Sequence, residues 1–172
     1  VKIVDTFQML GEVDRDLADA MGVDCIGVGG TRDIFDHDTE CMHEQVTPWG
    51  QKVLVPIQLD LTQDKEGDVY VYAGGDKNYP PSAVMPNGCF FINAIERQQP
   101  IDEDKLDPMD NLEEFNSITD EELDAYKKKV NEASATGRAV VASFGGTALG
   151  DVAFVPGMGL KEPKGIRSVV EW

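Results

Sequence analysis

Two stretches of the chain repeat apolar residues with the period of a helix, and each is followed by an apolar run. In residues 12–21 the apolar side chains fall on one helical face, and Gly22 stands where helices commonly end. Residues 23–28 then read as a short buried strand. The pattern predicts a helix followed directly by a strand.

The second stretch carries stronger helix signals. Thr119 and Glu122 have the spacing of a capping box, and Gly137 supplies a residue suited to the end of the helix. Residues 139–144 follow as an apolar strand. A helix followed by an apolar strand, found twice, is typical of parallel strands covered by helices, so we predict an α/β fold.

The residues between these two units follow a different pattern. Residues 58–62 and 69–72 alternate around a glycine-containing turn at 64–68, which predicts a β-hairpin, and Asn87-Gly88 suggests a second turn. We therefore expect a β-hairpin-rich insertion at about residues 45–95.

Composition narrows the range of partners. The 172 residues include 32 acidic and 15 Lys and Arg residues, a net charge of −17, which disfavours nucleic acid and anionic membrane surfaces. The three cysteines form no CxxC pair, and no apolar run is long enough to cross a bilayer. A cytoplasmic protein that acts on a small molecule is expected.

The loop after the first strand offers candidate active-site residues. Loops at the carboxyl ends of parallel strands commonly carry the reactive groups of α/β enzymes. Here Arg32 could clamp a substrate carboxylate and Asp33 could accept a proton, while Gly29 and Gly30 leave room for a ligand. In the alternative interpretation, Arg32 and Asp33 pair with each other on the surface.

The loop after the second strand is a further candidate for substrate binding. Phe144 would give an aromatic wall, and Gly145 and Gly146 would allow the backbone to approach a ligand closely. A purely structural tight turn explains the same residues.

One short stretch contains residue types that bind zinc. His37, Cys41 and His43 are interleaved with acidic residues, but their spacing matches no closed structural site. The alternative is an exposed polar loop, and we assign no metal ligand in this chain.

The final residues predict the start of another helix. Ser168 and Glu171 again have capping-box spacing. Because one turn cannot offset the cost of helix nucleation, we expect the chain to be an internal piece of a larger enzyme.

Four motifs, in order, resemble the uroporphyrinogen decarboxylase-like superfamily, in particular its bacterial, methyltransferase-related branch. They span nearly the whole chain and are Asp5-Thr6-Phe7-Gln8-Met9-Leu10-Gly11, Gly22-Val23-Asp24, Pro80-Pro81-Ser82 to Met85-Pro86, and Pro163-Lys164-Gly165-Ile166-Arg167 running into Glu171-Trp172.

This resemblance implies a (β/α)8 TIM barrel, which needs about 250 residues, so residues 1–172 would form part of one barrel domain. It also implies either cofactor-free decarboxylation of uroporphyrinogen acetate arms or methyl transfer with zinc and a corrinoid. No cofactor is expected in this chain, whereas zinc and corrinoid are possible in a complete protein.

The family pattern favours methyl transfer, because the tyrosine of the decarboxylases would fall near Ala153 or Phe154, where this chain has none. The competing hypothesis is a catalytically inactive piece that folds as a partial barrel and forms homo-oligomers or joins the missing remainder of the barrel. A third alternative is an acidic metal-binding module around His37, Cys41 and His43.

Overall fold

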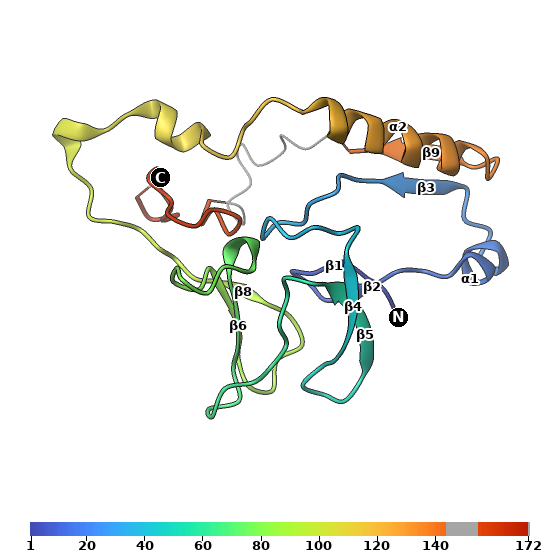
Figure 1. The fold of residues 1–172 in the computed structure, drawn as a ribbon, viewed down its shortest axis with the longest axis horizontal. Helices are drawn as coiled ribbons and strands as arrows, with labels where there is room; N and C mark the ends of the chain where they lie inside the picture. The colour runs from blue at the N-terminus through green and yellow to red at the C-terminus, as the bar shows by residue number, and fades with distance from the viewer. Residues whose placement is uncertain (144–154, 172) are drawn as a thin grey trace.

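The computed structural model describes residues 1–143 and 155–171, and the strands within these ranges are short (Figure 1). The α-helices are α1 (Arg15–Ala20) and α2 (Asp120–Ser134). The strands are β1 (Ile3–Asp5), β2 (Leu10–Gly11), β3 (Cys25–Val28), β4 (Met42–Val46), β5 (Lys52–Pro56), β6 (Val69–Val71), β7 (Ala83–Met85), β8 (Asn93–Ala94) and β9 (Ala139–Ala142). Single 3-10 turns are η1 (Ala73–Gly75), η2 (Glu103–Lys105) and η3 (Pro108–Leu112).

The predicted partial (β/α)8 TIM barrel is wrong. Over the described ranges the strands form separate sheets of two or three strands, in the orders β1-β2, β3-β9, β4-β5 and β6-β7-β8. A barrel requires successive parallel strands joined in one closed sheet. Apart from a single parallel bridge between Lys2 and Leu54, β3 and β9 are the only parallel pair within the described residues, because the chain between them forms antiparallel pairs instead of further helix–strand units.

The second helix–strand unit forms as its sequence signals predicted. Thr119 Oγ1 accepts the Glu122 amide at 3.2 Å, and a Glu122 carboxylate oxygen accepts the Thr119 amide at 2.8 Å, which completes the capping box of α2. The helix packs on both β3 and β9, with Tyr126 and Ala133 buried against Val28. Figure 1 shows α2, β9 and β3 lying together along one side of the molecule.

The first helix differs from its prediction in what it buries. It is followed by Gly22, whose φ of 67° is the left-handed conformation that glycine adopts easily at helix ends. The apolar face expected to pack inward is exposed, with Leu17 52% and Met21 68% accessible, and only Ala18 in the helix is buried. The helix therefore contributes little to the core.

Most of the core lies in the β-rich part of the chain. Alternate residues of β5 and β6 point inward, as expected for strands with one buried face. The fully buried large side chains of this cluster are Phe35, Val55, Leu59, Val69, Val71, Met85, Ile92 and Met158. The core thus joins residues from the middle of the chain to one near its end.

The predicted hairpin between residues 58–62 and 69–72 is wrong. The turn forms, since the Asp64 amide donates to the Asp68 carbonyl at 2.8 Å, but β6 pairs with β7. The backbone of residues 59–61 is bonded instead by the Gln45 side chain, which donates to the Leu59 carbonyl at 2.6 Å and accepts the Leu61 amide at 2.8 Å. A single side chain has replaced the expected strand partner.

Residues 155–171 form turns and irregular structure against residues 97–114. Met158 fills the core cluster, while Ser168 Oγ accepts the Val170 amide at 3.2 Å. The capping box predicted for Ser168 and Glu171 does not start a helix here, because residues 169–171 form a hydrogen-bonded turn. No helix among residues 1–143 and 155–171 is both long and apolar enough to cross a membrane.

Candidate functional site

The loop that follows β3 is organised around the carboxylate of Asp33. One oxygen, Oδ1, accepts the amides of Phe35 and His37, both at 2.9 Å. The other, Oδ2, accepts the Thr6 hydroxyl at 2.7 Å, which ties the loop to the segment after β1. A carboxylate with three hydrogen bonds on two oxygens is a strong anchor for a tight loop.

The ring of His37 lies directly behind Asp33 in the core. The side chain is fully buried, its Nε2 lies 3.0 Å from the Tyr72 carbonyl, and its ring stacks at a tilt on Phe35. Its Nδ1 lies 3.2 Å from Asp33 Oδ2, within ion-pair distance, although without the geometry of a hydrogen bond.

Asp33 is held in its ionised form. Burial by itself would raise the pKa of this carboxyl, but the neighbouring His37 and the Thr6 hydroxyl lower it by more, so the net pKa lies below its ordinary value of 3.8. Because its oxygens already accept these groups, the geometry gives Asp33 a positioning role. Its predicted catalytic role stays a prediction.

Arg32 pairs differently from the surface interpretation. Its Nη1 donates to the Asp36 carbonyl at 3.0 Å and lies 3.6 Å from the Asp36 carboxylate, so it does not pair with Asp33. The side chain is about half exposed. An ion pair of this kind contributes little free energy, which leaves Arg32 able to turn toward a bound anion.

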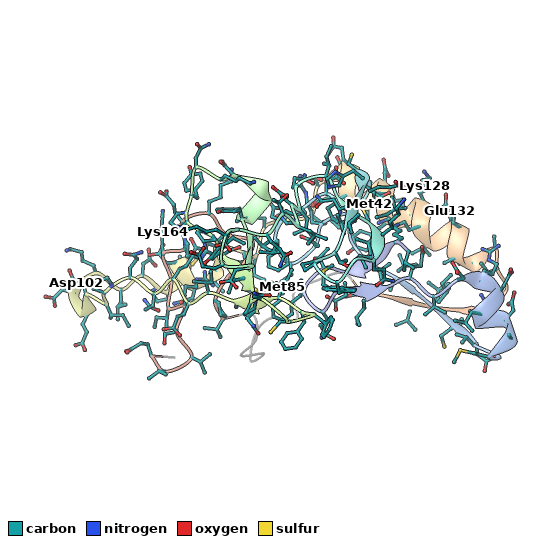
Figure 2. All side chains as sticks on the ribbon, turned by 90° about the horizontal axis from the view of Figure 1, so that it is seen from below. Met42, Met85, Asp102, Lys128, Glu132 and Lys164 are labelled. Carbon is teal, nitrogen blue, oxygen red and sulfur yellow. The ribbon has the colours of Figure 1, made fainter. Side chains whose placement is uncertain are left out.

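A cavity of about 700 Å³ opens beside this loop. Its walls come from three separate parts of the chain: the N-terminal segment with β1, the strand β3 with its following loop, and the inner face of α2. Figure 2 marks Lys128 and Glu132 on α2, both of which line the cavity. The volume lies within the range of about 300–1,000 Å³ typical of small-molecule sites.

The cavity is far less acidic than the rest of the chain. Its lining includes five basic and four acidic side chains, although acidic residues outnumber basic ones about two to one overall. The charged lining residues are Lys2, Arg15, Arg32, Lys128 and Lys129, with Glu12, Asp33, Glu40 and Glu132. One third of the 15 Lys and Arg residues therefore line this single cavity.

Three of these cations have no acidic partner among the described residues. Lys129 is engaged, since its Nζ lies 2.6 Å from a Glu40 carboxylate oxygen and donates to the Gly30 carbonyl at 3.0 Å. By contrast, Lys2, Arg15 and Lys128 form no ion pair with any described residue. They are the groups available to a ligand.

Four of the residues predicted for the site lie together at this cavity. Gly29, Gly30, Arg32 and Asp33 all contribute to its wall. A side chain at Gly30 would meet the Tyr126 hydroxyl, since an added Cβ would lie 3.1 Å from it. The candidates Phe144, Gly145 and Gly146 lie outside the described residues.

Sequence reasoning missed the residues that other segments bring to the cavity. Lys2 and Arg15 are single cations and Lys128 is the middle of three consecutive lysines, and none of them belongs to a binding motif, so spacing gives no signal for them. Thr6 belongs to the first of the resembling motifs, but nothing in the sequence links it to Asp33.

The zinc-type residues of the 37–43 stretch are dispersed by the fold. His37 is buried in the core, Cys41 is exposed, and the ring Nε2 of His43 lies 3.2 Å from the Leu59 carbonyl. Among residues 1–143 and 155–171, no group of three or more His, Cys, Asp or Glu side chains could hold a metal ion. The exposed-loop alternative does not describe His37 either.

No protein-family model, no curated protein and no solved structure matches this chain.

Proposed function

We propose that this chain binds a small organic anion, of the carboxylate class, in the cavity between β3, α2 and the N-terminal segment. The observation that carries the proposal is that three cationic side chains in one cavity of a strongly acidic chain, Lys2, Arg15 and Lys128, form no ion pair with any residue of ranges 1–143 and 155–171. An excess of acidic side chains elsewhere repels anions, so a site for one needs locally concentrated positive charge.

The walls of the cavity suit such a ligand in two further ways. Gly29 and Gly30 carry no side chains, so backbone groups of the loop are accessible to a carboxylate. Arg32 stands at the same wall with a planar guanidinium that can bind a carboxylate through two parallel hydrogen bonds.

Calorimetric titration with citrate, compared with its neutral triamide, tests the proposal. Citrate should bind and the triamide should not, and Lys128→Gln should weaken citrate binding about fivefold. The matched control is Lys65→Gln, which removes the same charge from an exposed turn. Equal binding of citrate and triamide, or equal loss in both variants, would refute an anion site in this cavity.

The resemblance to the uroporphyrinogen decarboxylase-like superfamily extends this proposal to a reaction. The bound carboxylate would be the substrate of a decarboxylation or, favoured by the motifs, of a methyl transfer. Zinc and a corrinoid would have to be held by residues outside ranges 1–143 and 155–171, since no group of side chains within these ranges could hold a metal ion. Arg32 would bind the substrate carboxylate, and Asp33 would hold the loop that carries it. Decarboxylation and methyl-transfer assays test this extension, and citrate binding without turnover in either assay would leave only the binding function.

Self-association is a second candidate, favoured by the exposed apolar side chains of the first helical segment. Val13, Leu17 and Met21 are each more than half accessible. Burial of such side chains against another copy would be favourable, whereas the net charge of −17 opposes it. Sedimentation velocity should show oligomers that grow with salt and disappear in Leu17→Lys, and a monomer at all salt concentrations would exclude this candidate.

A further inference from the structure

Residues 164–168 are bound to residues 98–113 through backbone amides that all donate to side chains. The amides of Lys164 and Gly165 donate to Glu113 Oε1 at 2.8 and 3.3 Å. The Ile166 amide donates to Asn111 Oδ1 at 2.7 Å, and the amides of Arg167 and Ser168 donate to Gln98 Oε1 at 2.6 and 3.0 Å. Five consecutive amides are thus bound by three side chains, as a protein binds an extended peptide.

Arg167 is the centre of this contact. Its side chain is only 3% accessible, its Nη2 lies 2.7 Å from Glu113 Oε1, and its Nη1 lies 2.9 Å from Glu114 Oε2. Longer contacts from the same guanidinium reach the Asp110 and Val155 carbonyls. A guanidinium held by two carboxylates is the strong, geometrically specific form of an ion pair.

The position two residues before the arginine admits only glycine. A Cβ added at Gly165 would lie 2.5 Å from the Asp110 carbonyl oxygen and 2.7 Å from Asn111 Oδ1. Backbone of one segment therefore lies directly against backbone of the other. Gly165 and Arg167 together define the sequence that this surface accepts.

The two segments are complementary in charge. Residues 97–114 contain seven acidic and two basic residues, whereas residues 161–171 contain three basic and two acidic residues. Figure 2 shows the labelled Lys164 beside this extended part of the chain and Asp102 at its far end. The acidic stretch, which by its sequence alone is an ordinary solvated surface, thus includes a binding surface for a basic segment.

The bound segment has a fixed end and a releasable end. Met158 is buried in the main core, and Arg97 donates to the carbonyls of Gly157 and Leu160, both at 2.7 Å. Lys161 is also held, since its Nζ lies 2.9 Å from Asp76 Oδ2 and Arg97 donates to its carbonyl at 3.2 Å. After Lys161 the segment is held mainly by the side-chain contacts described above, so release of residues 162–171 would leave the core cluster in place.

We propose that Gln98, Asp110, Asn111, Glu113 and Glu114 form a recognition surface for an extended peptide with glycine two residues before arginine. The chain's own residues 164–168 occupy this surface, and a protein partner that presents a Gly-x-Arg segment binds by displacing them. The surface is separate from the anion cavity and does not depend on the proposed function.

A labelled synthetic peptide of residues 161–171, added to the 172-residue chain, tests this proposal by fluorescence anisotropy. The wild-type surface is occupied, so its apparent affinity is reduced by the fraction of molecules that are open. Gly165→Ala in the chain should release the internal segment and tighten peptide binding by about tenfold or more. A peptide with alanine in place of arginine should not bind.

A second pair of variants separates recognition from unfolding. Arg167→Ala should also open the surface, whereas the double variant Gly165→Ala with Glu113→Gln should lose the peptide again. Hydrogen exchange of β4 and β5 reports whether the core stays folded in each chain. Absence of peptide binding to both opened chains with protected cores would overturn the proposal, as would equal binding to wild type and Gly165→Ala.

Exchange of the segment between two copies is the competing outcome. It would appear as a concentration-dependent dimer of the wild-type chain that the free peptide dissociates, and it would overturn the assignment to a foreign partner.

Discussion

The Asp33 carboxylate accepts hydrogen bonds from three groups and contacts the buried ring of His37. Its carboxylate joins the loop after β3 to Thr6, and its charge lies beside the buried ring of His37. Removal of one member of a buried polar group leaves the others unsatisfied, which costs more than the lost bond alone. The position of Arg32 at the cavity wall depends on this loop.

Asp33→Asn should lower the free energy of unfolding by about 2–4 kcal/mol, because the amide group cannot accept both the backbone amides and the Thr6 hydroxyl. Urea unfolding measures the change. Asp36→Asn is the matched control, since Asp36 is exposed and its φ of 61° suits asparagine. Its effect should stay within about 0.5 kcal/mol, and similar losses in both variants would contradict the anchoring role.

The stabilisation from Asp33 should depend on pH in a defined direction. Its pKa is lowered in the folded chain, despite the opposing effect of burial, by His37 and Thr6. A carboxyl with a lowered pKa contributes fully above its unfolded pKa, near 3.8, and loses this contribution as the pH falls through the folded value. The stability difference between wild type and Asp33→Asn should therefore be constant from pH 7 to about 5 and shrink below about 4. A difference that grows on acidification would show that the pKa is raised.

For the helices and strands, signals between neighbouring residues predicted where a helix begins and ends better than the alternation of apolar residues predicted which strands pair. The capping box of Thr119 and Glu122 and the glycines after both helices are properties of neighbouring residues, and they mark where α1 ends and where α2 begins and ends. The parallel pairing of β3 with β9 joins distant residues, and it was inferred from the repeated helix–strand order. Alternation does not say whether β6 pairs with the segment before it or with the strand after it, and β6 pairs with β7, the next strand along the chain, so alternation alone led to the wrong hairpin.

Of the candidate site, too, the sequence predicted the local part and missed the residues that distant segments contribute. The loop of Gly29 to Asp33 stands directly after a predicted strand, and it does line the cavity. Lys2, Arg15 and Lys128 reach the cavity only because α2 packs over β3 and the N-terminal segment lies beside them. The prediction of a barrel was wrong for a related reason, since two helix–strand units do not determine the structure of the residues between them.

Gln45 provides a test at this scale, because one side chain bonds the backbone of residues 59–61 in place of a strand. Gln45→Ala should lower the free energy of unfolding by about 1–3 kcal/mol, since it removes the partner of the Leu61 amide and leaves the Leu59 carbonyl with the more distant ring Nε2 of His43 at 3.2 Å. Hydrogen exchange of the Leu61 amide should accelerate as well. Glu44→Ala, on the exposed face of the same strand, is the control, and an unchanged Leu61 exchange rate in Gln45→Ala would contradict this assignment.

For the whole molecule, charge acts in two opposite ways. The excess acidic side chains behind the net charge of −17 repel one another and destabilise the compact state. The cavity, in contrast, concentrates cationic side chains that attract an anion. The main core lies in the β-rich part, and the parallel pair with α2 has only a small cluster of its own.

Added salt should therefore raise stability and weaken ligand binding at once. Between about 20 and 300 mM NaCl the screening length falls severalfold, so the midpoint of thermal unfolding should rise while citrate binds less tightly. Differential scanning calorimetry and titration calorimetry on the same samples measure both. A citrate affinity that is independent of salt would contradict a cationic site.

The pairing of β3 with β9 has a consequence for synthesis of the chain on the ribosome. Cys25 of β3 pairs with Ala139 of β9, so β3 leaves the ribosome long before β9 has been synthesised. At typical elongation rates this interval lasts on the order of ten seconds. During that time the hairpins of the β-rich part can form from contacts already present, whereas β3 has both edges open to chaperones or to neighbouring nascent chains.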